Sequence, residues 1–200
     1  SDFDQVRGLL EKHRPDYILH FAGSFGTEDS IQIYRVNVLS VTTLLEAVRR
    51  QVPKVVFVAV GSAAEYGHVK TSDLPVQEHL ECHPVSPYGL SKYLATLTVQ
   101  YYARVHTLSA MVVRPFQLIG KGVTDRLAPG AFAKRLKEAI ASGKREISVG
   151  NLESSRDFLD IQDAVRAIWM LCQKPAPGEI FNLCSGQPVR MKDLLDLMIS

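Results

Sequence analysis

Residues 55–62, VVFVAVGS, decide the fold that this sequence predicts. A short, uninterrupted apolar run that ends in turn-forming residues is typical of a strand buried on both faces, as in a parallel sheet. Ser62 is therefore expected just past the carboxyl end of a strand. Open parallel sheets place their ligand sites at that edge.

Short apolar runs recur on both sides of residues 55–62. Residues 17–22 and 109–114 each end in small or turn-forming residues, and helical periodicity predicts helices over 31–50 and 88–105 between the runs. This alternation with short connections predicts an α/β protein with a doubly wound parallel sheet. The carboxyl ends of parallel strands meet at one edge, so residues that follow different strands are expected to share a site.

Seven further elements are predicted around this centre. They are a helix at 3–13, a helix at 131–142, a short strand at 146–149, an extended run at 156–161, a helix at 163–173, a strand at 179–184 and a helix at 191–199. Trp169 is the single tryptophan, and we expect it to pack in the core.

Three features each have a structural and a functional interpretation. The small residues at 23–26, GSFG, either form a plain turn or let a ligand approach the backbone. Asn37 is either a solvated residue or ties a neighbouring strand to its helix. Tyr88 and Lys92, in the segment SPYGLSK at 86–92, are either a surface pair or a catalytic pair. Side chains at i and i+4 share a helical face, and a nearby ammonium would lower the pKa of the phenol.

The composition is that of an ordinary soluble globular protein, with 46% hydrophobic and 22% charged residues. The net charge is +2 and the basic residues are scattered, which argues against nucleic-acid and membrane partners and favours a small molecule. The three cysteines lack CxxC spacing, so neither disulfides nor a metal site are expected. No apolar run is long enough for a membrane span and no signal peptide is visible, which predicts a cytoplasmic protein.

An ordered set of motifs resembles the extended short-chain dehydrogenase/reductase family, also called the NAD-dependent epimerase/dehydratase family, which acts on nucleotide sugars. The motifs are Phe21-Ala22-Gly23, Asn37, Gly61-Ser62, Tyr88 with Lys92, Arg114-Pro115-Phe116 and Arg156-Asp157-Phe158. Within that family the sequence is most similar to GDP-4-keto-6-deoxy-mannose reductases. The stretches that carry this likeness are 65–67, 149–153 and 182–186. The resemblance implies a Rossmann-like fold.

The resemblance also implies roles for individual residues. The implied catalytic residues are Ser62, Tyr88 and Lys92. The implied contacts of the NAD(P)(H) cofactor are Phe21, Ala22, Gly23, Asn37, Val60, Tyr88, Lys92, Pro115 and Phe116. The implied substrate contacts are Ser62, Ala63, Gln117, Lys134 and Arg156. A structural salt bridge is the alternative for Arg156, and a solvated helix residue is the alternative for Lys134.

Ala64 bears on the reaction, because related 4,6-dehydratases carry an acidic residue two positions after the catalytic Ser or Thr. Alanine cannot accept a proton. Glu65 is not an expected substitute, since a shift of one residue in an extended segment turns the side chain to the opposite face. Reduction of a carbonyl group and epimerisation remain.

The family's first strand and glycine-rich turn, which bind the cofactor pyrophosphate at a helix N-terminus, do not occur in these residues. We therefore expect a partial NAD(P)-binding Rossmann domain at 1–120, truncated at its N-terminus. A small α/β substrate-binding part is expected at 121–200, incomplete at its C-terminus, with 156–172 returning to the Rossmann domain. The chain as given is expected to bind NAD(P) weakly.

The resemblance implies a nucleotide-sugar oxidoreductase that reduces the C4 ketone of a GDP-4-keto-6-deoxy-hexose with NAD(P)H. A 4-epimerase of the same family and a non-catalytic binding module without cofactor are the alternatives. Relatives dimerise through the helices that correspond to those of Asn37 and Tyr88, and the apolar residues of both helices permit the same homodimer here.

Overall fold

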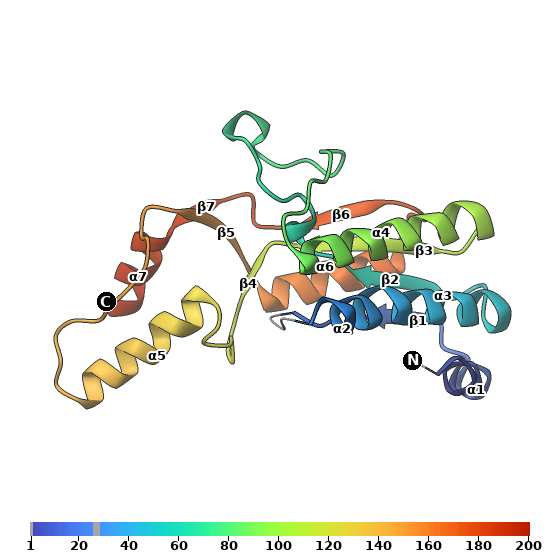
Figure 1. The fold of residues 1–200 in the computed structure, drawn as a ribbon, viewed down its shortest axis with the longest axis horizontal. Helices are drawn as coiled ribbons and strands as arrows, with labels where there is room; N and C mark the ends of the chain where they lie inside the picture. Colours follow the sequence, from blue (N-terminus) through green and yellow to red (C-terminus); the bar gives the residue numbers. More distant parts are fainter. Residues whose placement is uncertain (1, 26–28) are drawn as a thin grey trace. The chain divides into compact units, whose positions relative to one another are not determined.

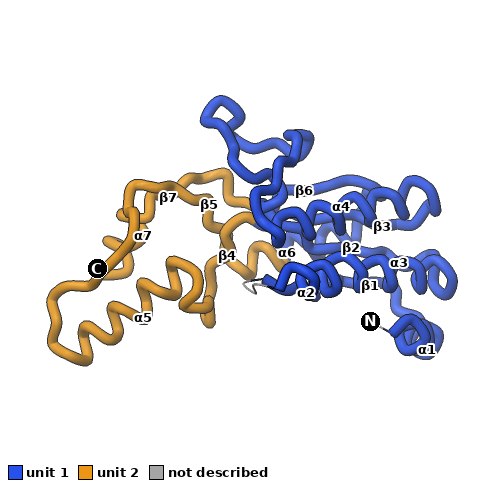
Figure 2. The backbone as a smooth tube through the Cα atoms, in the orientation of Figure 1, with its two compact units in different colours: residues 1–115, 166–183 blue, residues 116–165, 184–200 orange. Residues whose placement is uncertain are grey.

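The computed structural model describes residues 2–25 and 29–200 (Figure 1). Gly26, in the turn predicted after the first strand, lies outside the described residues. The chain divides into two compact units (Figure 2). Unit 1 comprises residues 1–115 and 166–183, and unit 2 comprises residues 116–165 and 184–200. Each unit is described by itself below.

Unit 1 contains a parallel sheet of four strands, which confirms the predicted fold class. In spatial order the strands are β1 (Tyr17–His20), β2 (Val56–Val60), β3 (Ala110–Pro115) and β6 (Ile180–Leu183). The register aligns Ala59 of β2 with His20 of β1 and with Val112 of β3, so the strands end at similar levels. Their carboxyl ends therefore form one edge.

Helices flank this sheet. They are α1 (Phe3–His13), α2 (Ser30–Tyr34), a π-helical turn (Arg35–Leu39), α3 (Ser40–Gln51), α4 (Pro87–His106) and α6 (Ile161–Gln173), of which residues 166–173 belong to unit 1. Ile18 packs against the core formed by α3 and α4, whereas the ring centroid of its neighbour Tyr17 lies 5.4 Å from that of Trp169 on α6. Successive side chains of a strand point to opposite faces, so α6 lies on the other face of the sheet.

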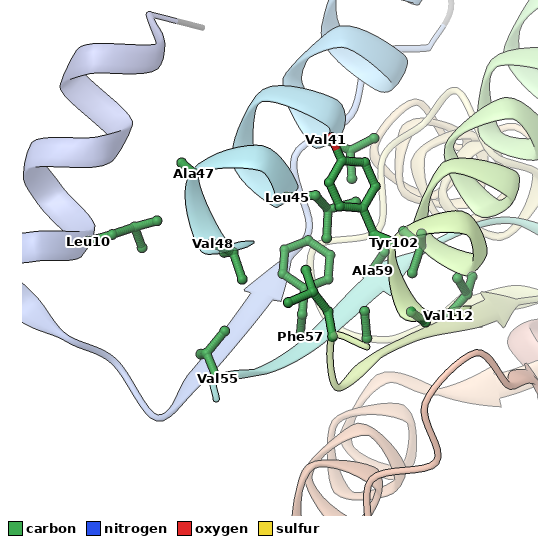
Figure 3. Packing of buried hydrophobic residues seen from close by; sticks show 14 residues of the cluster. Leu10, Val41, Leu45, Ala47, Val48, Val55, Phe57, Ala59, Tyr102 and Val112 are labelled. Atoms are coloured by element: carbon green, nitrogen blue, oxygen red, sulfur yellow. The ribbon is translucent and has the colours of Figure 1, made fainter. Parts of the chain in front are cut away.

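The main core lies between the sheet and helices α3 and α4 (Figure 3). Val41, Leu45 and Val48 recur at helical spacing along α3 and are fully buried. They pack with Phe57 of β2 and Val112 of β3, which come from two neighbouring strands of the sheet. The apolar periodicity of the sequence is thus what fixes α3 against the sheet.

Unit 2 is smaller and mixed. Its strands are β4 (Gln117–Ile119), β5 (Ser155–Asp160) and β7 (Pro188–Arg190), in that spatial order, with β4 parallel and β7 antiparallel to β5. Its helices are α5 (Ala128–Ala141) and α7 (Met191–Ile199), and α6 begins in it. Phe132 of α5 and Leu194 of α7 are buried in a separate small core.

Three local predictions are corrected by the structure, and two short strands had not been predicted. Residues 146–149 form no strand; Ile147 and Val149 pack against the small core without pairing. β4 and β7 were not predicted, because three residues are too few for a periodic pattern. Strand β1 is not buried on both faces, since it is the edge strand and Tyr17 is 40% exposed. Trp169 is 48% exposed and lies outside the core.

Two expectations drawn from the sequence as a whole concern disulfides and membrane-spanning helices. No disulfide joins the three cysteines, all of which lie in described parts of the chain. None of the helices in the described residues is long and apolar enough to cross a membrane.

Candidate active site

Ser62 lies just past the carboxyl end of β2, as predicted. It caps a short 3-10 helix, Ala63–Glu65, by accepting a hydrogen bond from the backbone N–H of Ala64 at 3.1 Å. The Glu65 carboxylate returns to accept the backbone N–H of Ser62 at 2.8 Å. This reciprocal capping box fixes the serine at the edge of the sheet.

Tyr88 occupies the first turn of α4. Ser86 caps that helix and Pro87 starts it, which is the arrangement expected from their preferences. The Ser62 side chain lies close enough to the Tyr88 phenol to affect its pKa, and the ring centroid of Tyr88 lies 6.2 Å from that of Phe25. Burial raises the pKa of Tyr88; the nearby Ser62 side chain opposes this rise and the charge of Glu65 adds to it. The phenol is therefore protonated at neutral pH.

Lys92 lies one turn further along α4 and is 6% exposed. Its ammonium donates a hydrogen bond to the Val60 carbonyl oxygen at 2.8 Å, and burial lowers its pKa. The structure does not support the prediction that Lys92 lowers the pKa of Tyr88: the ammonium is directed to the end of β2, and burial raises the pKa of the phenol.

Asn37 is 2% exposed and sits in the π-helical turn. Its amide accepts the backbone N–H of Ser24 at 2.7 Å and donates to the Ser24 carbonyl at 3.0 Å. It also donates to the hydroxyl of Ser91 on α4 at 2.8 Å. Of the two interpretations of Asn37, the structure excludes the solvated one, because this side chain ties the segment after β1 to α4.

Gly23 brings the segment after β1 close to these side chains. A Cβ atom added there would lie 3.2 Å from the Lys92 ammonium and 3.5 Å from the Asn37 amide oxygen. The predicted cofactor residues of unit 1 gather at the same edge of the sheet. Phe21, Ala22 and Gly23 follow β1, Val60 ends β2 and Pro115 ends β3.

The remaining predicted site residues belong to unit 2, which contains an open cavity of about 300 Å³. Its lining comes mainly from β4, α5 and the segment around residues 150–158, and includes Gln117, Phe132, Arg135, Asn151, Arg156 and Phe158. Arg156 donates to the backbone carbonyl of Ser155 at 2.7 Å, and the described residues offer it no ion pair. Phe116 precedes β4 in the same unit.

Lys134 does not line this cavity; its ammonium lies 2.7 Å from the Asp125 carboxylate. Its neighbour Arg135, which the sequence interpretation missed, lines it instead and donates to the Ser148 carbonyl at 2.8 Å. The helical spacing from Phe132 is the signal that could have found Arg135, since residues three apart share a face.

A buried ion pair was also missed. Glu65 is fully buried and its carboxylate lies 2.8 Å from Nε of Arg114, which is 2% exposed. Glu65 was not expected to replace an acidic residue at position 64, on the argument that an extended segment turns its side chain to the opposite face. That argument is wrong, because residues 63–65 form a 3-10 helix. Burial and pairing with Arg114 are what make Glu65 unsuitable as a proton acceptor for a substrate. The pattern Ser62-x-x-Glu65, a capping box, was the available signal.

Comparisons with known proteins identify relatives of this chain. The chain is 31% identical over 198 residues to GDP-6-deoxy-D-mannose reductase of Pseudomonas aeruginosa, covering 96% of this chain and 64% of the relative. It is 31% identical over 184 residues to GDP-6-deoxy-D-talose 4-dehydrogenase of Aggregatibacter actinomycetemcomitans, covering 90% of this chain and 60% of the relative. The structure of RMD from Pseudomonas aeruginosa complexed with NADPH matches with a TM-score of 0.90 and 30% identity, covering 98% of this chain and 68% of that one.

The chain therefore spans somewhat less than two thirds of the length of these curated relatives. The family described as the NAD dependent epimerase/dehydratase family matches residues 1–184, which is most of the chain. On these matches and on the parallel sheet with its site at the strand ends, the chain belongs to the NAD-dependent epimerase/dehydratase family.

Proposed function

We propose that the protein is a nucleotide-sugar oxidoreductase that reduces the C4 ketone of a GDP-4-keto-6-deoxy-hexose with NAD(P)H. The observation that carries the proposal is the close packing of the loop that follows Ser62 against the first turn of α4, which carries Tyr88, with Lys92 one turn further along the same helix. The similarity to GDP-6-deoxy-D-mannose reductase supports a GDP-linked sugar.

The residues of unit 1 fit a nicotinamide cofactor. Gly23 leaves open backbone beside the Lys92 ammonium and the Asn37 amide, where a side chain would intrude. Lys92 has three N–H donors, and Val60 accepts only one of them, so the others can hold the ribose of the cofactor. The cofactor supplies the hydride for the reduction.

Tyr88 supplies the proton in this proposal. Its raised pKa keeps the phenol protonated at neutral pH, so it can give its proton to the oxygen of the reduced C4 carbonyl as negative charge develops there. Ser62 stabilises the negative charge on the same oxygen by donating a hydrogen bond to it. Ala64 offers no second base, so elimination of water is not supported.

The cavity of unit 2 supports a diphosphate-linked substrate. Arg135 and Arg156 both line it, and a guanidinium matches phosphate oxygens bidentately. Gln117 adds an amide that can contact the sugar or its phosphates. We assign the substrate role predicted for Lys134 to Arg135. Ala63, next to Ser62, remains a proposed substrate contact in unit 1.

In domain terms, we propose that residues 1–115 and 166–183 hold the cofactor and that residues 116–165 and 184–200 hold the nucleotide, which moves the expected boundary from 120 to 115 and the return to the Rossmann domain from 156 to 166. The protein is further proposed to be a cytoplasmic homodimer. Helix α4 exposes an apolar row that a second copy would cover: Leu90, Leu94, Leu97, Tyr101 and Val105. Light scattering on Leu97→Glu tests this contact, because a charge in the row should leave the protein monomeric; an unchanged dimer would contradict it.

The activity is tested by incubating full-length protein with GDP-4-keto-6-deoxy-mannose and NADPH while following nicotinamide absorbance. A reductase consumes NADPH and substrate in equal amounts. A 4-epimerase, which Ala64 leaves open, yields an isomerised sugar without net consumption of cofactor. If neither a product nor consumption of cofactor is observed, the proposal is refuted and a non-catalytic relative is favoured.

A further inference from the structure

The fully buried carboxylate of Glu65 has no part in the proton transfer proposed above, yet it contacts three elements of unit 1. One oxygen accepts the backbone N–H of Ser62, after β2, at 2.8 Å. The other accepts the hydroxyl of Thr96, on α4, at 2.9 Å and Nε of Arg114, on β3, at 2.8 Å. Because each partner comes from a different element, the carboxylate fixes these elements relative to one another.

Two of the three partners determine where the proposed catalytic groups lie. Ser62 carries a hydroxyl that lies close enough to the phenol of Tyr88 to lower the pKa of that phenol. Thr96 lies eight residues after Tyr88 on α4, so Tyr88, Lys92 and Thr96 occupy one face of that helix at successive turns. The Glu65 carboxylate therefore links the backbone of the serine directly to the helix of the tyrosine.

Two glycines make this close approach possible. A Cβ atom at Gly61 would collide with the Glu65 carboxylate, and one at Gly89 would lie 2.5 Å from the backbone oxygen of Ala64. The loop that follows β2 is thus packed directly against the first turn of α4. A small displacement of the loop changes the distance between Ser62 and Tyr88.

Arg114 keeps the carboxylate in place. Besides its bond to Glu65 it donates to the Tyr66 hydroxyl at 3.0 Å, and its guanidinium lies 4.7 Å from the centroid of the Tyr66 ring. Tyr66 in turn donates to the side chain of Asn182 on β6 at 2.7 Å. A buried charge needs such pairing, because an unpaired carboxylate in the interior is strongly unfavourable.

We propose that Glu65 is a positioning residue for the reaction: its carboxylate sets the distance between Ser62 and Tyr88 by binding the Ser62 amide and the Thr96 hydroxyl together. The proposal rests on the function proposed above, and it differs from a contribution to stability alone. A stabilising contact would change how much protein is folded, whereas a positioning contact changes the turnover of the folded enzyme.

Thr96→Val in the full-length protein is the sharpest test, because it removes one hydrogen bond from Glu65 and leaves the ion pair with Arg114 intact. Displacement of reacting groups by a fraction of an ångström should lower kcat by about tenfold or more, with the KM values for sugar and NADPH within about twofold of wild type. Thr96→Ser keeps the hydroxyl and should restore kcat. The matched control is Thr98→Val, because the Thr98 hydroxyl bonds, among the residues that the structure describes, only the Leu94 carbonyl of its own helix.

The outcomes separate the alternatives. A Thr96→Val enzyme that is less stable but keeps wild-type kcat would overturn the proposal. Glu65→Gln, checked for folding by circular dichroism, should show the same selective loss of kcat; full activity in that variant would also overturn it. If wild type itself turns over no substrate, the proposed function fails, and hydrogen exchange decides the positioning role separately. Thr96→Val should then speed exchange of the Ser62 amide by about tenfold relative to Thr98→Val, and equal rates would refute it.

Discussion

Two helical glycines should respond in opposite directions to the same substitution. An alanine in place of glycine inside a helix gains up to about 1 kcal/mol from backbone propensity. At Gly8 in α1 nothing lies within 4 Å of the added Cβ atom, so Gly8→Ala should gain most of that amount. At Gly89 in α4 the added Cβ would lie 2.5 Å from the Ala64 backbone oxygen, which must retreat by about 0.9 Å to reach ordinary contact at 3.4 Å.

The cost at Gly89 should exceed the gain. Forcing an extra carbon into a packed site typically costs about 1–3 kcal/mol, which outweighs a propensity term of about 1 kcal/mol or less. Urea unfolding followed by circular dichroism should therefore show Gly8→Ala above wild type and Gly89→Ala below it. The displaced loop carries Ser62, so kcat of full-length Gly89→Ala should also fall, by about a hundredfold for a shift near 1 Å. Equal stabilisation by both substitutions would refute the close packing of the loop against α4.

Three other outcomes are expected. Tyr88→Phe should remove turnover of the full-length enzyme, by about a hundred- to ten-thousandfold, while its circular dichroism is unchanged; wild-type activity would exclude Tyr88 as the acid. Arg135→Ala should raise the substrate KM by about tenfold with kcat retained, since a lost charge-assisted bond costs roughly 1.5 kcal/mol; an unchanged KM would remove it from the substrate site. The hydrogen bond from Arg49, with Arg50, lowers the pKa of Glu46 to about 2, so this stabilisation is present above pH 4.5 and lost as pH falls toward 2. Glu46→Gln should flatten that acid dependence in urea unfolding, and an unaltered slope would contradict the assignment.

The central strands and helices were predictable because each depends on a local pattern. The apolar run at 55–60 must be covered on both faces, and in the structure it forms the largely buried strand β2. The spacing of Val41, Leu45 and Val48 similarly requires a helix with one buried face. Strands β4 and β7 could not be found in this way, since three residues carry no period and their pairing with β5 is set by the tertiary fold.

For the candidate site, the positions of residues along the chain were predictable from the sequence, and their contacts were less so. The positions of Ser62, Tyr88 and Lys92 follow from strand ends and helical spacing. The buried pair of Glu65 and Arg114 was missed because charged residues are usually exposed, and sequence alone does not show which two of them will meet. Both residues belong to stretches that carry the family resemblance, Arg114 to Arg114-Pro115-Phe116 and Glu65 to 65–67, so a charged residue near a strand end merits a search for a buried partner.

Lys92 shows how spacing and direction differ. Helical spacing correctly places its side chain on the face of Tyr88, but the backbone decides where a long side chain finds its acceptor. The Val60 carbonyl, left at the end of β2, takes one ammonium hydrogen at 2.8 Å, and Gly23 leaves room on the other side. The ammonium is thus held beside the strand ends that a cofactor would approach, while burial raises the pKa of the Tyr88 phenol and the nearby Ser62 side chain opposes that rise. This direction of the ammonium agrees with the proposal that Lys92 holds the ribose of the cofactor.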